Sequence, residues 1–311
     1  MGGAYHIALG FDQNYLCPFY ALADSLQALH GDGDLVVHAM VSGVSEADKE
    51  DIVRFLATRH NRIIFYEPDQ ALVDRFVLLN KWTGAVYYRL FLPLMVPPSV
   101  SRLLYLDTDI IAVRPLHDLF GQPLNGQAVG AVADNYVGTQ PLIGITEVGE
   151  YFNSGVLLID IPAWKRQLVT EKAIDYLNRY PERIRFVDQC ALNAVLQKQW
   201  YKMPGVFNAI YSRIPQEVPT RVLRSEFLPA QYLIHFTLNR PWEMLSKNPF
   251  NYLYRQHLKR TPYGQRRKVI IDFEWAKVPA WCRLRLIQWY VNQPLLSSLW
   301  RTIKGVVTSQ S

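Results

Sequence analysis

Residues 4–42 read AYHIALGFDQNYLCPFYALADSLQALHGDGDLVVHAMVS, and their pattern determines the expected fold. Residues 4–11 form an apolar, strand-like run, residues 15–30 have the apolar spacing of a helix, and residues 35–42 are strand-like again. Alternation of strands and helices predicts a mostly parallel sheet that is covered by helices. We therefore expect an α/β protein.

The alternation continues beyond this stretch. Ser45, followed by Asp48 three positions later, suits the N-cap of a helix over 45–60 with an acidic first turn. Further expected strands are residues 62–67, 102–107, 127–134, 150–160 and 231–236; further helices are 85–96, which Pro97 and Pro98 end, and most of 162–199.

Bulk composition limits the class of protein. Of 311 residues, 50% are hydrophobic and 19% charged, which supplies a core and argues against disorder. The sequence has three cysteines, Cys17, Cys190 and Cys282, and no C-x-x-C pair, so we expect neither a disulfide framework nor a zinc site. We expect the protein to reside in a reducing compartment. The N-terminus has no signal-peptide pattern, and no apolar run reaches the roughly 18–20 residues that span a bilayer.

Charge is distributed unevenly along the chain. Residues 1–254 hold 22 of the 33 Lys and Arg and 25 of the 27 Asp and Glu, whereas residues 255–311 hold 11 basic residues and only Asp272 and Glu274 as acids. We expect a main domain over 1–258, a linker near 259–268 and a basic, aromatic-rich helical segment within 259–311.

The basic segment is a candidate membrane surface. Residues 281–304 mix Arg and Lys with Trp, Leu and Ile, which suits an interfacial helix on anionic lipid, broken by Pro294. A basic tail also suits nucleic acid. The aromatic and aliphatic side chains favour the membrane, so no nucleic-acid partner is expected.

Two acids follow the expected strand at 102–107. In LLYLDTDIIAV (103–113), Asp107 and Asp109 are two positions apart, so they share a face if the backbone stays extended. Two carboxylates with open positions beside them suit Mg²⁺ or Mn²⁺ that holds a diphosphate. The alternative is a strand end that turns out to solvent. A second pair, Asp32 and Asp34, lies in the Gly-rich stretch HGDGDL, where turn formation explains it.

Ligands of open α/β sheets bind outside the carboxyl ends of the strands. Asp12, the pair Asp107 and Asp109, and Asp134 each follow a strand-like run. We expect them to meet at one edge of the sheet.

Six segments, read in order, resemble glycosyltransferase family 8 over roughly residues 5–245, with a likeness to its bacterial lipopolysaccharide galactosyl- and glucosyltransferases. They are DQNYL (12–16), YYRLFLP (87–93), LYLDTDIIAV (104–113), YFNSGVLLID (151–160), VDQCALN (187–193) and HFTLNRPW (235–242). The resemblance implies a Rossmann-like nucleotide-sugar-binding domain with a mixed sheet, of the GT-A type. It also implies a UDP-sugar donor, Mn²⁺ (with Mg²⁺ as alternative), retention of configuration, and a saccharide or lipid-linked saccharide acceptor such as lipopolysaccharide core. A cytoplasmic enzyme, peripheral on the inner face of the cell membrane, would meet such an acceptor.

The resemblance also assigns roles to residues. It makes Asp107, Asp109 and His235 metal ligands, and it places Asp188 and Gln189 at the reacting carbon as catalytic residues. The implied donor-binding residues are Gly10, Asp12, Asn14, Tyr15, Arg89, Asp134, Asn153, Ser154 and Arg240. Without the resemblance, Asp12 suits an N-cap, Arg89 a solvated or stacked arginine, and His235 a structural histidine.

Three departures from the family pattern stand out. Cys190 replaces one acid of the D-Q-D segment, Leu238 stands where the last loop usually has glycine, and Ser154 replaces the usual alanine. Because an amide is a poor nucleophile, Gln189 favours front-face departure and attack over a covalent intermediate. Two other readings remain: a sugar-nucleotide binder without activity, and a D-x-D phosphohydrolase with Asp107 as nucleophile.

Overall fold

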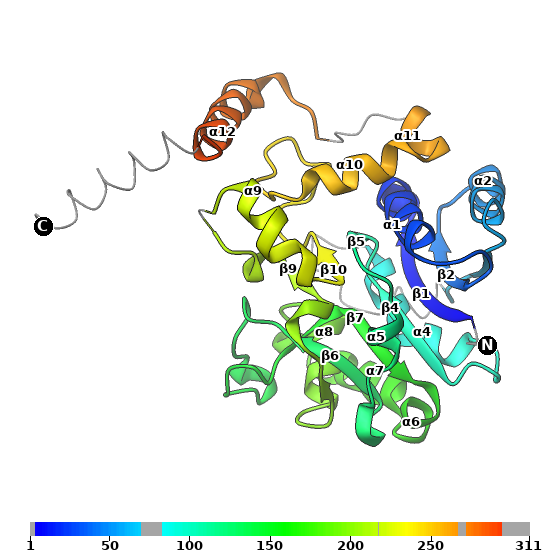
Figure 1. Cartoon of the computed structure of the whole chain (residues 1–311). Coiled ribbons are helices and arrows are strands. Elements are labelled where there is room, and N and C mark those ends of the chain that lie inside the picture. The colour runs from blue at the N-terminus through cyan, green and yellow to red at the C-terminus, as the bar shows by residue number, and fades with distance from the viewer. Residues whose placement is uncertain (1–3, 70–82, 217, 267–271, 294–311) are drawn as a thin grey trace, which may run out of the picture.

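The computed structural model describes residues 4–69, 83–216, 218–266 and 272–293 (Figure 1). A seven-stranded sheet has the order β3-β2-β1-β4-β7-β6-β8, and a three-stranded sheet has the order β5-β10-β9. The strands are Tyr5–Asp12 (β1), Leu35–Ser42 (β2), Arg62–Tyr66 (β3), Arg102–Leu106 (β4), Ile110–Ala112 (β5), Val129–Ala133 (β6), Phe152–Asp160 (β7), Tyr201–Lys202 (β8), Ala209–Ile210 (β9) and Leu233–His235 (β10).

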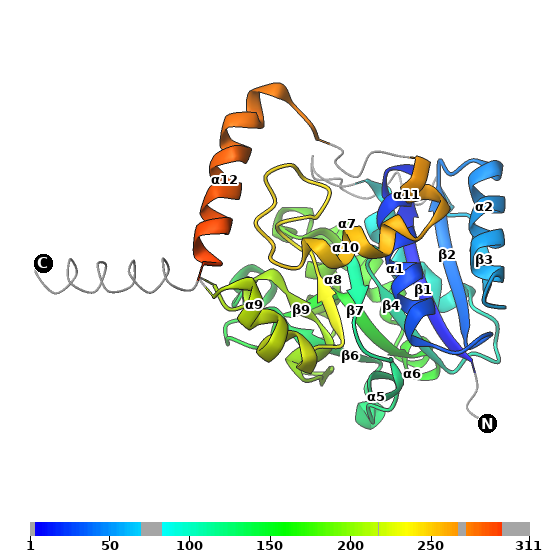
Figure 2. The same ribbon diagram turned by 45° about the horizontal axis from the view of Figure 1, so that its top comes forward.

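Helices cover the large sheet and fill the connections (Figure 2). They are Leu16–Leu29 (α1), Glu46–Ala57 (α2), Tyr88–Met95 (α4), His117–Phe120 (α5), Ile161–Arg166 (α6), Val169–Arg179 (α7), Val187–Val195 (α8), Thr220–Val222 (α9), Asn251–Lys259 (α10), Pro262–Arg266 (α11) and Val278–Val291 (α12). Among the described residues, no helix is both long and apolar enough to cross a membrane.

The sheet is mixed and mostly parallel, as predicted. β1 pairs in parallel with β2 and β4, β2 with β3, and β6 with β8, whereas β7 runs antiparallel to both β4 and β6. Because β4 and β6 are both antiparallel to β7, they run in one direction, and their carboxyl ends face the same edge. Asp12, Asp107 and Asp134 therefore follow the same edge of the sheet, which confirms the expectation from their positions in the sequence.

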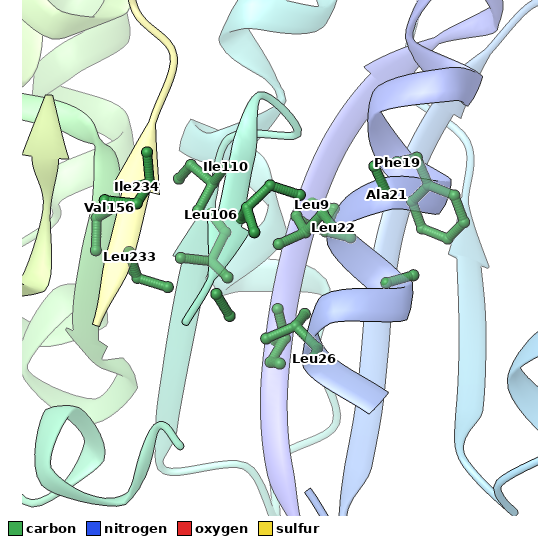
Figure 3. Packing of buried hydrophobic residues seen from close by; sticks show 14 of the residues in the cluster. Leu9, Phe19, Ala21, Leu22, Leu26, Leu106, Ile110, Val156, Leu233 and Ile234 are labelled. Atoms are coloured by element: carbon green, nitrogen blue, oxygen red, sulfur yellow. The ribbon is translucent and has the colours of Figure 1, made fainter. Parts of the chain in front are cut away.

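The core on one side of the sheet lies under α1 and the small sheet. Figure 3 shows Leu22 of α1 beside Leu9 of β1, and Ile234 of β10 beside Val156 of β7. All four side chains are buried. Leu22 and Leu26 are four residues apart and so share the helix face that packs on the sheet. The small sheet thereby holds His235, the last residue of β10, close to the end of β4.

Two local predictions are confirmed. The Ser45 hydroxyl accepts a hydrogen bond from the Asp48 N–H at 3.1 Å and caps α2. In the turn before β2, the Asp34 carboxylate accepts from the Gly31 N–H at 2.8 Å, and Gly33 has a φ of 79°, which the absence of a Cβ allows. The second D-x-D pair is therefore part of a turn.

Two boundaries differ from the prediction. The expected helix 85–96 begins as a 3₁₀ turn, Gly84–Tyr87, before α4. The expected linker at 259–268 is helical in its described part: α10 ends at Lys259, and α11 follows after the buried Thr261. The ring of Tyr263 stacks on Tyr20 of α1 with centroids 5.3 Å apart. Proline is common both in linkers and in the first turn of a helix, so Pro262 does not distinguish the two in the sequence.

Candidate active site

The two acids of LYLDTD lie at the junction of β4 and β5. The backbone N–H of Asp107 donates to the Gly155 carbonyl at 2.8 Å, and the Asp109 carbonyl accepts from the Phe236 N–H at 2.9 Å. These bonds tie the acids to β7 and to the end of β10. Asp109 is only 8% exposed, and the Asp107 side chain is 26% exposed, so the segment does not turn out to solvent.

His235 completes a compact group with these acids. Its Nε2 lies 3.1 Å from Asp109 Oδ1 and 3.8 Å from Asp107 Oδ2, and ligand atoms of the three residues lie within 4.8 Å of one another. The opposite ring nitrogen, Nδ1, lies 3.0 Å from Oδ1 of the buried Asn208. This contact orients the ring so that Nε2 faces the carboxylates. Asn208 was missed in the sequence, where it is one polar residue before a short strand and lies outside all six segments.

Gly155 makes the room that this group needs. A Cβ at Gly155 would lie 2.3 Å from Cε1 of His235 and 2.5 Å from Oδ2 of Asp107. Any side chain there would displace both. Two carboxylate oxygens and one imidazole nitrogen suit Mn²⁺, and the hard carboxylates also suit Mg²⁺. The residues present therefore fit a divalent cation.

The buried acid and imidazole each favour the charged form of the other. Burial alone would lower the pKa of His235, but Asp109 and Asp107 outweigh it, and the pKa is raised above its ordinary value. Burial opposes ionisation of Asp109 as well, but His235 and Arg240 lower its pKa. Below the raised pKa of His235, a cation that binds Nε2 competes with a proton for this atom.

Binding of Mn²⁺ is therefore expected to release about one proton below the raised pKa of His235, and the affinity should fall as pH falls through that pKa. Calorimetric titration in two buffers of different ionisation enthalpy measures this release. His257→Gln is the control, since His257 contacts Asp24 at 2.8 Å on another part of the surface. An affinity independent of pH in the wild type would contradict the assignment of His235 as ligand.

Arg89 joins the metal-ligand group to α8. It is 6% exposed, with Nη2 3.0 Å from Asp107 Oδ1 and Nε 2.9 Å from Asp188 Oδ2. Its Nη1 donates to the Ser154 carbonyl at 2.6 Å, and its guanidinium lies over the Tyr105 ring at 4.7 Å. Arg89 is thus a buried, fully engaged cation and not a solvated one.

Asp188 and Gln189 occupy the first turn of α8. Burial raises the pKa of Asp188 to about 6, although Arg89 opposes the shift. The Gln189 Oε1 accepts from the Ser154 N–H at 3.0 Å and from the Asn153 amide at 3.3 Å, while its Nε2 lies 3.5 Å from Asp134. These bonds fix the Gln189 amide against the start of β7.

Cys190 is the fourth residue of α8 and lines neither pocket. Its Sγ accepts from the Phe186 N–H at 3.3 Å and lies 3.4 Å from the Tyr151 hydroxyl, in a fully buried position. In this chain the cysteine therefore stabilises the start of α8.

Two pockets meet at the acids. One is lined by Gly10, Phe11 and Tyr15 from β1 and its following turn, and the other by Asp134, Asn153, Ser154 and Gln189. Both share Arg89, Asp107, Asp109 and Arg240. Arg240 comes from the loop after β10, with its Nε 3.6 Å from Asp109 Oδ2. The arrangement offers a continuous groove whose middle carries the carboxylates, the imidazole and two cations.

Two predicted donor residues lie beside the pockets. The Asp12 carboxylate accepts from the Asn14 N–H at 2.8 Å and caps the turn Gln13–Tyr15, which is the N-cap role considered for it. Asn14 is exposed, and neither residue lines the two pockets. Leu238, at the glycine position of the family, is 47% exposed and lines the second pocket.

Comparison with known proteins adds an independent observation. The model of the family "Glycosyl transferase family 8" matches residues 6–246. General stress protein A of Bacillus subtilis (strain 168) is 27% identical over 272 residues, which cover 83% of this chain and 94% of that protein. Lipopolysaccharide 1,2-glucosyltransferase of Escherichia coli (strain K12) is 25% identical over 281 residues, covering 86% and 83%.

A solved structure shares the fold. The galactosyltransferase LgtC, in complex with donor and acceptor sugar analogues, superimposes with a TM-score of 0.71 at 22% identity, covering 83% of this chain and 96% of that one. At this identity the likeness establishes the architecture alone.

Proposed function

The chain belongs to glycosyl transferase family 8, and from this premise we propose that it transfers a hexose, galactose or glucose, from a UDP-sugar to a saccharide acceptor. The observation that carries the proposal is the junction of two pockets at Asp107 and Asp109, the two acids that lie beside His235. A nucleotide sugar has two neutral ends joined by a diphosphate. The groove has the matching order of an aromatic-lined end, a charged middle and a polar end.

Each end of the groove suits one end of the donor. Tyr15, which lies in the first pocket near Arg240, offers a ring face for uracil. Gly10 lines the same pocket, and its lack of a Cβ makes room for Tyr88, since a Cβ there would lie 2.9 Å from that of Tyr88. Asp134, Asn153 and Ser154 offer converging donors and acceptors for the hydroxyls of a hexose. Sites that hydrogen-bond each hydroxyl distinguish epimers strongly, so these side chains are proposed to select the sugar.

The charged middle suits the leaving group. Asp107, Asp109 and His235 would hold Mn²⁺, or Mg²⁺, which when bound supplies positive charge to the departing diphosphate. Arg240 adds a permanent cation beside Asp109 and is proposed to contact a phosphate. Arg89 contacts both Asp107 and Asp188, and it is proposed to fix the position of the sugar-binding side chains relative to the diphosphate-binding ones.

Retention is proposed to proceed on the front face of the sugar. Gln189 is a neutral amide whose oxygen already accepts bonds from Ser154 and Asn153, so it is a poor nucleophile. Asp188 is held 2.9 Å from Arg89 and faces the same pocket, where its negative charge can stabilise positive charge on the anomeric carbon. The leaving phosphate then takes the acceptor's proton.

The configuration of the product tests this mechanism. Proton NMR of the transferred sugar should show the anomeric coupling of the donor. Mass spectrometry of the enzyme after incubation with donor alone should show no mass increase. An inverted product, or a hexose attached to Asp188 or Gln189, would contradict it.

A lipid-linked acceptor, such as lipopolysaccharide core, would be met at a membrane surface, and α12 is proposed to bind that surface on its cytoplasmic side. No residue of α12 with a described side chain is buried, and Leu286 and Trp289 are 66% and 58% exposed. Trp275, in the turn just before α12, is 81% exposed. Exposed aromatic and aliphatic side chains beside arginines are typical of interfacial helices.

Leu286→Ser with Trp289→Ser should lower binding to vesicles of anionic lipid by at least about tenfold, because two large apolar groups lose burial in the interface. Co-sedimentation with vesicles measures it. The matched control is Val53→Ser with Val148→Ser, two exposed apolar residues elsewhere. Equal losses in both double variants would refute the role of α12.

A further inference from the structure

Among the described residues, α10 and α12 each carry a buried hydrogen-bond donor that has no acceptor. The Nε of Arg255 on α10 and the indole Nε1 of Trp281 on α12 are both buried atoms, and neither has a hydrogen-bond partner in the described part of the chain. Arg285, one turn after Trp281, has its guanidinium 5.6 Å from the Trp281 ring. The pKa of Arg255 is lowered, mainly by burial and to a smaller extent by the positive charge of Arg285.

No acid among the described residues forms an ion pair with Arg255 or Arg285. Within residues 4–69, 83–216, 218–266 and 272–293, neither Arg255 nor Arg285 has a carboxylate within ion-pair distance, and Arg285 donates only to Gln288 at 2.8 Å. The acids nearest in sequence to α12 are engaged elsewhere: Asp272 and Glu274 contact Lys277 at 3.2 and 2.7 Å. Guanidinium groups keep their charge at any physiological pH.

Neighbouring elements fix this geometry. The Thr220 N–H at the start of α9 donates to Asn292 Oδ1 at 2.8 Å, which ties the end of α12 to the body of the protein. Arg224, one turn later, lies over the ring of Tyr252 on α10 at 3.7 Å. Figure 2 shows α12 at the periphery, away from the central sheet. The end of α12 is thus tied to α9, and Arg255 and Arg285 come from two different helices, α10 and α12.

We propose that Arg255, Arg285 and the indole of Trp281 bind a phosphate group, and that this group belongs to an anionic phospholipid. A phosphate supplies several acceptor oxygens and the missing negative charge, and guanidinium groups match it with paired donors. The lipid source follows from the exposed Leu286 and Trp289 on the same helix, whose apolar side chains suit the adjoining interface. This inference rests on the membrane association proposed for α12, and it assigns the headgroup contact.

The test compares two double variants that remove the same charge. Arg255→Gln with Arg285→Gln removes the site, whereas Arg221→Gln with Arg283→Gln removes two exposed arginines from α9 and α12. Binding to phosphatidylcholine vesicles that contain phosphatidylglycerol is measured by co-sedimentation. The site variant should lose at least about tenfold more affinity than the control, because hydrogen-bonded charge contributes more than diffuse attraction. Arg255→Lys with Arg285→Lys keeps the charge, so this variant should retain part of the affinity that the Gln variant loses.

Two results would overturn the assignment. Equal losses in the two Gln variants would mean that the attraction is diffuse. Calorimetric binding of inorganic phosphate that only the site variant loses, with equal vesicle binding of both variants, would assign the site to a soluble phosphate. UDP release should be unchanged in every variant, which also shows that each is folded. If the wild type releases no UDP from any UDP-sugar but the vesicle difference persists, the glycosyltransfer proposal fails and the phosphate site stands.

Discussion

Replacing Asp109 with asparagine is expected to reduce metal-dependent UDP release by at least about a thousandfold, or about 4 kcal/mol in activation free energy. Asn keeps the shape of the side chain but removes the charge that a divalent cation requires. Asp109 is also the acid closest to His235, at 3.1 Å, so its loss disturbs a second ligand. Initial rates over a series of Mn²⁺ concentrations measure the effect.

The second D-x-D pair provides the matched control. Asp32 lies in the turn before β2 with its carboxylate 3.5 Å from Arg59, at the surface. Asp32→Asn should leave the rate within about twofold, since surface ion pairs contribute little. A comparable fall in both variants, or full activity of Asp109→Asn, would remove the metal site from the account.

Arg89→Met is expected to have the second largest effect, this time on stability. Arg89 neutralises two carboxylates, those of Asp107 and Asp188, in a position only 6% exposed. Removing one partner from a buried ion pair leaves uncompensated charge and typically costs about 3–5 kcal/mol. Urea unfolding should show a loss of this size in the free energy of unfolding at pH 7.

A second substitution separates charge from packing. Asp188→Asn in the Arg89→Met background removes one of the two orphaned charges and should restore roughly half of the loss, a coupling that a double-mutant cycle isolates. The pKa of Asp188 is raised to about 6 in the folded chain, above the unfolded value. The folded state therefore binds this proton more tightly than the unfolded state does. The contribution of Asp188 to the free energy of unfolding is complete below about pH 4 and is lost as the pH rises through about 6. Recovery by Asp188→Asn should accordingly be larger at pH 7 than at pH 4.

Much of the fold followed from local pattern. The strand–helix alternation predicted the sheet because buried strands and amphipathic helices have different apolar periods. The turn at Asp32–Asp34 and the cap at Ser45 followed from backbone chemistry that needs no distant contact. The helices α10 and α11 were not predicted, and a linker was expected near 259–268. Their packing depends on α1, more than 200 residues earlier, as the stacking of Tyr20 on Tyr263 shows.

The sequence predicted which residues form the metal site but not the contacts that hold them in place. The six segments pointed to Asp107, Asp109 and His235, and the structure brings these three together. That Arg89 joins Asp107 to Asp188, and that Asn208 orients His235, could not be read from sequence. The first contact depends on how α4 and α8 are placed against the end of β4, and the second on how the segments of β9 and β10 pair.

Release of UDP from UDP-galactose and UDP-glucose, measured with Mn²⁺ and again with excess chelator, tests the central claim most directly. The account predicts turnover with at least one donor, its loss with chelator, and its recovery when Mn²⁺ is restored. Unchanged turnover in chelator would contradict the metal site. Binding of the donors without turnover would indicate a sugar-nucleotide binder, and phosphate release from simple monoesters a phosphohydrolase; either would contradict the proposed glycosyltransfer.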